Sequence, residues 1–372
     1  MLSDDKVPGT NTGILETLAD HNVKINERLN IKDGTGIGSI ISASLVDDDR
    51  DYTIEELPVA SGHESIAWGK KSKATGKRAV AIGNSNTSSG NCSFVVGQTN
   101  IAESTAAGAI VSGNENIVSG AYSATLGQKN VNKATSTFVT GLANEVHSQE
   151  GQQHVVGGKW NKIYENSGNF NTVFGAINEI HSGSANAIAG EGNILSETCG
   201  SYNAVFGYRN TNNGSTNIIA GTGHNVSGSS NAIVGNQNKV DGNNVFVAGT
   251  QNEITGYGMS VLGVKNKSNH GASDNTHLIG RELRTPEPIT NQIVMGIFNK
   301  PTYDLFIVGN GDSDDSRSNA FIITQDGRAK IQSAPIEEND VVRLKELQDQ
   351  VTQLQAQIDE LKAMIPTFTR LI

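Results

Sequence analysis

The strongest constraint on the fold is a short pattern that repeats from residue 67 to residue 296. Each copy is a run of small or aliphatic residues that ends in glycine, as in Val80, Ala81, Ile82 and Gly83. The sixteen anchor glycines stand at positions 69, 83, 97, 113, 127, 141, 157, 175, 190, 207, 221, 235, 249, 263, 280 and 296. Eight of the fifteen steps between them are fourteen residues long, and the others are fifteen to eighteen. A fixed period this short is typical of a solenoid.

A second regular feature is an asparagine three positions after the anchor glycine. The residues at this position are Asn86, Asn100, Asn116, Asn130, Asn144, Asn178, Asn193, Asn210, Asn238, Asn252 and Asn266, and two copies have the asparagine one position later, at Asn161 and Asn225. Gly and Asn supply the positive φ that tight turns require, so each period predicts two short strands and two turns. The stacked asparagines either form an amide ladder along the solenoid or merely occupy left-handed turn positions.

Both faces of the strand before each glycine are apolar. Val, Ile or Leu stands two residues before the glycine in thirteen copies, which predicts a buried core row. The positions one and three before the glycine point the opposite way and include Phe94, Val96, Leu126, Phe138, Phe174, Phe206, Phe246 and Leu262. A two-strand rung is too thin to cover this second face, which would be a long exposed stripe on a monomer. We therefore expect a homotrimer of parallel coils.

The Val-Ala-Ile-Gly anchors, their fourteen-residue spacing and the small-residue turns resemble the head repeats of trimeric autotransporter adhesins, the YadA-like family. The resemblance covers the repeat domain, residues 66–299. It implies an all-β solenoid in the form of a trimeric left-handed parallel β-roll. The same repeat is also found in phage tail fibres, so the resemblance is specific for the fold and not for the function.

Residues 1–32 predict an N-terminal arm and a short helix that docks the protein. The helix is expected because residues alternate three and four apart around one polar layer: Leu15, Leu18, Asn22, Ile25 and Leu29. Residues 33–65 predict a cap on the first rung, since the open end of a solenoid exposes unpaired strand edges. The acidic run from Asp47 to Asp51 lacks the spacing of an EF-hand loop, so we interpret it as a solvated turn.

Residues 300–333 predict a closing β segment. The run from Leu305 to Gly311, followed by the run from Arg317 to Phe321, resembles the segment that closes such rolls in phage tail fibres and related virion proteins. Asp326 and Gly327 predict a hairpin turn between residues 321–324 and residues 329–331.

Residues 334–372 predict a C-terminal coiled coil and tail. Apolar residues alternate three and four apart for about three heptads, which makes them the expected trimerisation residues: Leu344, Leu347, Val351, Leu354, Ile358, Leu361 and Ile365. The heptads alone also fit a dimer, and the repeat domain favours three chains. Pro366 is expected to end the helix.

The amino-acid composition disfavours some classes of function. The 42 glycines and 5% aromatic residues in 372 positions suit a solenoid better than a compact enzyme. A formal charge of −10 without a Lys/Arg cluster disfavours nucleic acid as a partner. No nucleophile elbow, phosphate loop, Cys-x-x-Cys or His-Glu-x-x-His motif is present, so we expect no catalytic residues, no metal site and no cofactor. Cys92 and Cys199 lie many rungs apart, which disfavours a disulfide.

Candidate receptor-binding residues lie where the repeat is most irregular. Trp160 and Tyr164 fall in the zone of residues 147–174, where exposed aromatic rings either stack on sugars or proteins or fill a distorted rung. Tyr208 and Arg209 form a second candidate after Gly207. His147 and His181 occupy equivalent positions and are interpreted as repeat-derived surface residues.

These features predict a structural and adhesive homotrimeric fibre of a phage or phage-tail-like particle. We expect it to bind a host cell-surface glycan or protein, with its N-terminal segment on other virion or tail baseplate proteins. The start of the sequence has no leader pattern and no run is long enough to span a membrane, so we expect synthesis in the host cytoplasm without a signal peptide, and no membrane insertion. The alternatives are a cell-surface trimeric adhesin and a virion spacer without a receptor site.

Overall fold

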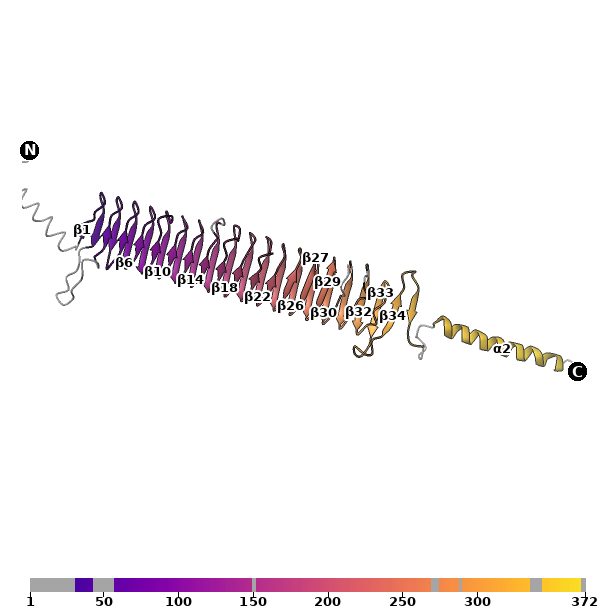
Figure 1. Cartoon of the computed structure of the whole chain (residues 1–372). Helices are drawn as coiled ribbons and strands as arrows, with labels where there is room; N and C mark the ends of the chain where they lie inside the picture. The colour runs from indigo at the N-terminus through magenta and orange to yellow at the C-terminus, as the bar shows by residue number, and fades with distance from the viewer. Residues whose placement is uncertain are drawn as a thin grey trace, which may run out of the picture. The chain divides into compact units, whose positions relative to one another are not determined.

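The computed structural model describes residues 31–42, 57–148, 152–268, 274–287, 290–334 and 343–368. The chain divides into unit 1, Met1–Gly223, and unit 2, His224–Ile372, and each is described by itself. Both units are parallel β-solenoids, which confirms the predicted all-β solenoid (Figure 1). The predicted N-terminal helix with Leu15, Leu18, Asn22, Ile25 and Leu29, and the acidic run Asp47 to Asp51, lie outside the described residues.

The wide sheet of unit 1 contains one strand from each turn of the coil. Its parallel strands are β2 (Ile40–Ser42), β4 (Ile66–Trp68), β6 (Val80–Asn84), β8 (Phe94–Gln98), β10 (Ile110–Asn114), β12 (Ala124–Gln128), β14 (Phe138–Leu142), β16 (Val155–Lys159), β18 (Thr172–Ala176), β20 (Ala187–Glu191), β22 (Ala204–Tyr208) and β24 (Ile218–Thr222). Glycine lies opposite glycine in the register, as Gly113 does opposite Gly127. At one edge β1 (Ile31–Asp33) pairs antiparallel with β2.

The narrow sheet of unit 1 is built from two-residue strands. They are β3 (Val59–Ala60), β5 (Lys73–Ala74), β7 (Thr87–Ser88), β9 (Ile101–Ala102), β11 (Ile117–Val118), β13 (Val131–Asn132), β15 (Glu145–Val146), β17 (Lys162–Ile163), β19 (Glu179–Ile180), β21 (Ile194–Leu195) and β23 (Thr211–Asn212). The second residue of each strand is buried, as Val118 and Ile163 are. It meets the predicted core row of the wide sheet, which includes the buried Val95 and Val173. The core is therefore a single layer of side chains between two thin sheets.

An asparagine ladder runs along the corner where the wide strand turns toward the narrow one. In unit 1 its members are Asn86, Asn100, Asn116, Asn130, Asn144, Asn161, Asn178, Asn193 and Asn210, each donating through Nδ2 to Oδ1 of the asparagine before it. The left-handed position belongs to the residue before the asparagine, as in Ser85 (φ 57°) and Thr99 (φ 55°). The ladder interpretation is therefore the correct one of the two.

A second asparagine row, which the sequence analysis missed, lies on the other corner, four residues before the anchor glycine. In unit 1 it comprises Asn171, Asn186, Asn203 and Asn217, and each Oδ1 accepts the backbone N–H of the next member. The row begins at His154, whose Nδ1 accepts the backbone N–H of Asn171 at 3.3 Å. The recurrence of Asn at this position in five successive copies, through Asn231, was the signal available in the sequence.

Two of the assigned repeat positions are wrong. Gly158, not residue 157, pairs with both Gly141 and Gly175, so Asn161 stands three residues after its anchor without displacement. Gly158 takes the role because it has a φ of +112° and a Cβ there would lie 2.0 Å from the carbonyl oxygen of Gly175. In unit 2 the ladder position belongs to His224, whose Nδ1 accepts the N–H of Asn238 at 3.1 Å, while Asn225 lies in a strand.

Unit 2 repeats the same two-sheet design. Its wide sheet contains β26 (Ala232–Asn236), β28 (Phe246–Thr250), β30 (Ser260–Val264), β31 (His277–Arg281), β32 (Ile293–Ile297) and β33 (Phe306–Asn310), and its narrow sheet contains β25 (Asn225–Ser227), β27 (Lys239–Asn243) and β29 (Glu253–Tyr257). Gly309 lies opposite Gly296, so the parallel pairing continues one strand beyond the expected boundary at residue 299.

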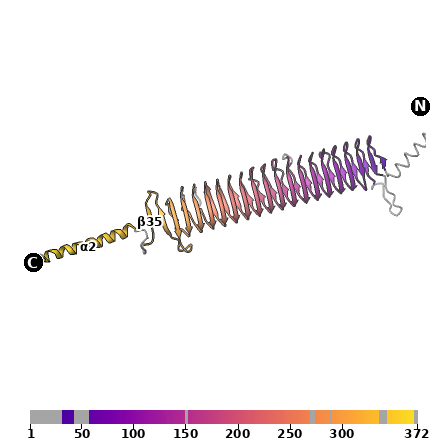
Figure 2. The same cartoon turned by 180° about the vertical axis from the view of Figure 1, so that it is seen from behind.

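The closing segment of unit 2 switches from parallel to antiparallel pairing. β34 (Asn319–Ile323) runs antiparallel to β33, and β35 (Ala329–Ile331) runs antiparallel to β34, with Ile323 opposite Ala329. Gly327 has a φ of 82° in the connection, which confirms the predicted hairpin. Figure 2 shows β35 from behind, next to the last strands of the parallel stack.

The last element is the helix α2 (Leu344–Phe368). It continues two residues past Pro366, which was expected to end it, because a proline in the last turn removes only one backbone hydrogen bond. The predicted trimerisation side chains that can be described are exposed in the single chain, at 44–70%: Leu344, Leu347, Val351, Leu354, Ile358 and Leu361. The side chain of Ile365 lies outside the described residues. Among the described helices there is none with the length and apolar character needed to cross a bilayer.

Candidate binding surfaces

The outer face of the wide sheet in unit 1 carries two apolar rows. They consist of the residues one and three positions before each anchor glycine, which point away from the core. Phe174 is 47% exposed and Phe206 is 43% exposed, although neighbouring turns cover part of each ring. The other exposed aromatic members of these rows are Trp68, Phe94 and Phe138. The second apolar face predicted from the sequence is thus present and uncovered in the single chain.

The outer face of the narrow sheet is mixed: it carries charged ladders beside outward aliphatic side chains such as Ile101 and Ile117. In unit 1 Lys162 Nζ lies 3.2 Å from a carboxylate oxygen of Glu145, one turn away. In unit 2 a carboxylate oxygen of Glu253 lies 3.6 Å from Nζ of Lys239 and its other oxygen lies 3.0 Å from Nζ of Lys267. The two faces of the roll therefore differ in character, and the apolar wide face is the one suited to burial against another chain.

Tyr164 belongs to a network on the narrow sheet of unit 1. Its ring stacks on His181 with centroids 4.0 Å apart and planes inclined by 16°, and its hydroxyl donates to Glu179 at 3.3 Å. His181 Nε2 also lies 2.8 Å from Glu179 Oε2, and burial is the main cause that raises the pKa of Tyr164. The phenol is held within its own network, so Tyr164 is the least available of the four predicted receptor-binding residues.

The turn before Tyr164 uses the same pattern of His and Glu. His147 Nε2 lies 2.9 Å from Glu145 Oε2, and this hydrogen bond is the main cause that lowers the pKa of Glu145. The carboxylate of Glu145 in turn raises the pKa of Lys162. His147 and His181 thus occupy matching surface positions, each beside a glutamate of its own strand.

Trp160, Tyr208 and Arg209 lie on a different surface, the corner with the first asparagine ladder. Trp160 has φ 56° and Arg209 has φ 53°, because both occupy the left-handed position before a ladder asparagine. Trp160 is 50% exposed and Tyr208 is 37% exposed. The structure thus brings together three of the four predicted receptor-binding residues and leaves Tyr164 on the narrow sheet.

Comparison with known families identifies the repeat. Residues 60–86 match the YadA head domain repeat, in two copies. This stretch carries YadA-like head repeats. Residues 139–242 match the grass antifreeze beta roll, which agrees with the roll architecture of the strands there. The search of curated proteins gives no match. These head repeats and the β-solenoid fit an adhesin-like fibrous protein.

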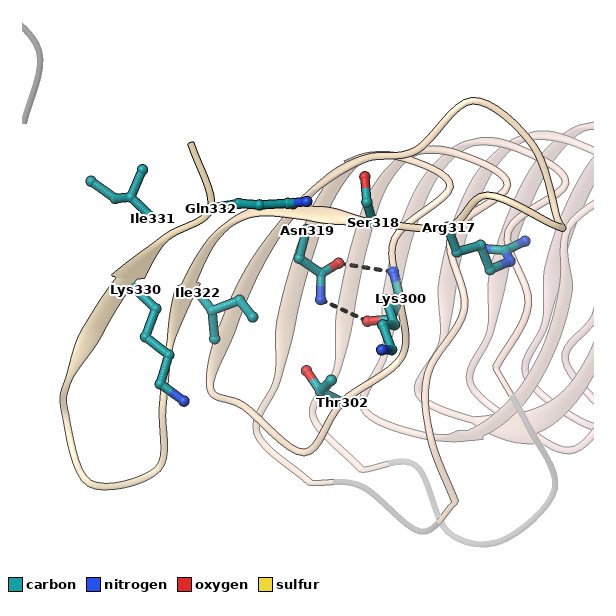
Figure 3. Close-up of a pocket in the computed structure, with 9 residues that line it drawn as sticks. All are labelled: Lys300, Thr302, Arg317, Ser318, Asn319, Ile322, Lys330, Ile331 and Gln332. Carbon is teal, nitrogen blue, oxygen red and sulfur yellow. Dashed lines mark hydrogen bonds between the residues drawn. The ribbon is translucent and has the colours of Figure 1, made fainter. Parts of the chain in front are cut away.

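The closing segment of unit 2 forms a pocket of about 450 Å³ (Figure 3). Asn319 accepts the backbone N–H of Lys300 through Oδ1 and donates to the Lys300 carbonyl through Nδ2, both at 2.8 Å. The lining residues are Lys300, Thr302, Arg317, Ser318, Asn319, Ile322, Lys330, Ile331 and Gln332. The sequence analysis did not find this hollow, because it depends on how the antiparallel strands leave the stack.

The two cysteines differ in environment. Cys92 is exposed at a corner, whereas Cys199 is buried, and both are free thiols. Burial raises the pKa of Cys199 to about 12. The Cys199 thiol therefore stays protonated at neutral pH and is a weak nucleophile.

Proposed function

We propose that the protein is a homotrimeric, adhesive fibre of a phage or phage-tail-like particle that attaches the particle to a host cell surface. The observation that carries this proposal is the pair of apolar rows on the wide sheet, with Phe174 and Phe206 exposed in the single chain. A continuous apolar surface of this kind marks an association site. Three parallel rolls that turn these rows toward a common axis bury them and leave the charged narrow sheets in water.

The helix α2 supports association of the same chains. Its heptad residues, including Leu354 (57% exposed) and Ile358 (44% exposed), have no cover in the single chain. A parallel coiled coil buries such a seam between helices and fixes their register. A coiled coil of three α2 helices, which follow the roll in the sequence, would hold the three chains together at one end.

The assignment to a particle rests on the closing segment and on the expected docking arm. The run from Leu305 to Gly311 resembles the segment that closes rolls in phage tail fibres, and here it includes β33, which continues the parallel pairing. Residues 1–32 would bind baseplate or other virion proteins, and the protein would be made in the host cytoplasm. Several fibres with three equal sites each would bind a cell by avidity, without catalysis.

The cell-surface trimeric adhesin is the second candidate, because residues 60–86 match the head repeat of that class. Immunogold electron microscopy of the producing strain separates the two candidates. We expect gold on released phage or tail-like particles. Gold confined to the cell envelope would replace the particle assignment with the surface adhesin.

The oligomeric state and adhesion are tested on the purified full chain. We expect light scattering to give three times the chain mass of 39.2 kDa, and labelled protein to bind intact host bacteria. A folded monomer in solution would refute the trimer. A trimer that binds no bacterial cell would indicate a structural spacer instead of an adhesin.

A further inference from the structure

Two aromatic residues far apart in sequence, Trp160 and Tyr208, share one corner of unit 1. The register of the wide sheet places Lys159 opposite Ala176, Ala176 opposite Glu191, and Glu191 opposite Tyr208. The next position along the chain forms a parallel row, since Ile177 N–H donates to the Lys159 carbonyl (3.0 Å) and Arg209 N–H to the Glu191 carbonyl (2.9 Å).

The surface that results spans three steps of the coil. We call it the aromatic corner and define it as Lys159, Trp160, Ile177, Glu191, Tyr208 and Arg209. At about 4.8 Å per step, it is roughly 14 Å long. This length suits a short oligosaccharide and is small for a protein interface.

Each end of the aromatic corner pairs an aromatic ring with a cation. Lys159 Nζ lies 3.7 Å from the ring centroid of Trp160, and Arg209 Cζ lies 4.7 Å from that of Tyr208. Within the described parts of the chain, neither Lys159 nor Arg209 forms an ion pair with a carboxylate. Their charges are therefore open to an external anion.

At two other places the cation at this repeat position is paired with a carboxylate. Lys129, which holds the repeat position of Trp160 and Arg209 two turns before Trp160, lies 3.7 Å from Glu115. Lys265 of unit 2 holds this position too and lies 3.7 Å from Glu282. A cation–aromatic pair also occurs at these positions in unit 2, where Arg281 Cζ lies 5.5 Å from the ring centroid of Phe298. The aromatic corner differs in having one such pair at each end, 3.7 Å and 4.7 Å from the ring centroids.

In the middle of the aromatic corner the surface projects little, and most of its residues are small or apolar. Ile177 is 44% exposed, and its neighbours Ala176 and Gly192 are small. The stem of Arg209 lies over Gly192, where an added Cβ would be 3.3 Å from Arg209 Cγ. Glu191 is exposed there and offers a carboxylate that accepts hydrogen bonds from hydroxyl groups.

We propose that the aromatic corner binds an acidic oligosaccharide. This inference rests on the proposed adhesive function and names the chemical class of its receptor. Sugar rings present C–H faces that pack on exposed Trp and Tyr rings. The sugar carboxylates accept hydrogen bonds from the guanidinium of Arg209 and the ammonium of Lys159.

The test uses the purified full chain and a glycan array with matched probes. The probes are oligogalacturonates and α2,8-linked oligosialates, each beside the same oligomer with its carboxylates methyl-esterified. We expect binding to at least one acidic oligomer and loss of that binding on esterification. Trp160→Ala, Tyr208→Ala and Arg209→Gln should each weaken it about tenfold or more.

Two control variants separate this site from its surroundings. Lys129→Gln changes a cation in the same repeat position, and Tyr164→Ala changes an aromatic residue on the narrow sheet; both should bind as the unchanged protein does. Equal binding of acidic and esterified probes, retention of binding in Trp160→Ala, or no binding to any acidic probe would each overturn the proposal. Attachment to bacteria that survives Trp160→Ala and Arg209→Gln would keep the adhesive function and place its receptor site elsewhere.

Discussion

Asn100 donates two hydrogen bonds to a single atom of Asn86, one from its backbone N–H (3.0 Å) and one from its side-chain Nδ2 (3.1 Å), both to Oδ1. The same geometry recurs at each later step of the unit 1 ladder. Every member is fully buried, so each amide replaces hydrogen bonds that the backbone would otherwise make to water. Removing one member leaves the buried backbone N–H of the next member without its acceptor.

Asn144→Ala should therefore strongly destabilise the roll. Asn144 Oδ1 accepts from both N and Nδ2 of Asn161. Without it the buried backbone N–H of Asn161 would have no partner, whereas Nδ2 would keep the carbonyls of Gly157 and Gly175. We expect a loss of about 2–4 kcal/mol in the free energy of unfolding. Urea denaturation measures this free energy. The control is Gln128→Ala, at an exposed position, which should change the free energy of unfolding by less than about 0.5 kcal/mol. Similar stabilities of the two variants would contradict the role of the ladder.

Gly141→Ala should prevent two turns from stacking. Gly141 has φ +114°, and a Cβ there would lie 1.9 Å from the carbonyl oxygen of Gly158, a backbone atom that cannot rotate away. We expect Gly141→Ala to lower the free energy of unfolding by more than about 3 kcal/mol, or to prevent folding. Gly327→Ala provides the comparison, because nothing lies within 4 Å of its Cβ and only backbone strain of about 1 kcal/mol remains. In thermal unfolding, Gly141→Ala should therefore have a lower Tm than Gly327→Ala.

His154 should make the stability of the roll depend on pH. Burial lowers the pKa of His154 to about 4, so the unfolded chain takes up a proton near the ordinary value of about 6.5, before the folded chain does. The folded state then loses stability as pH falls from about 6.5 to about 4, by roughly 3 kcal/mol in total, and the loss from this group stops below that range.

His154→Asn tests the origin of this pH dependence. Asn would extend the second asparagine row toward Asn171 with a group that does not titrate. Urea denaturation at pH 7 and pH 4.5 should show a smaller difference for His154→Asn than for the unchanged protein. An identical difference would mean that other groups cause the acid sensitivity.

Leu354→Asn should weaken association through α2. Leu354 is 57% exposed in the single chain and stands at a core position of the predicted coiled coil. Burial of a polar side chain at that seam costs stability, so light scattering on dilution should show dissociation at higher concentration than for the unchanged protein. Gln353→Ala, one residue before Leu354 and at a c position away from the seam, should leave the mass unchanged. Equal behaviour of both variants would indicate that the roll alone holds the chains together.

Local periodicity explains why so much of the fold could be predicted. The spacing of glycines determined the strands of the wide sheet, because each turn contacts only its neighbours and must repeat the same backbone geometry. The error of one residue at Gly158 arose where two glycines are adjacent, since only the pairing with Gly175 shows which of them has positive φ. The second asparagine row was missed because it occupies only part of the solenoid: earlier copies have Ser93, Ala109 and Ser123 at the same position.

The sequence by itself determined the solenoid, the core row, the apolar outer face and the closing hairpin, because each follows from a short-range pattern. Only the tertiary structure decided that Trp160 and Arg209 share a corner, whereas Tyr164, four residues from Trp160, lies on another face. The physical reason is that one turn of the coil takes fourteen to seventeen residues and advances only about 4.8 Å. Side chains separated by whole turns become neighbours, and side chains a few residues apart are separated by a corner.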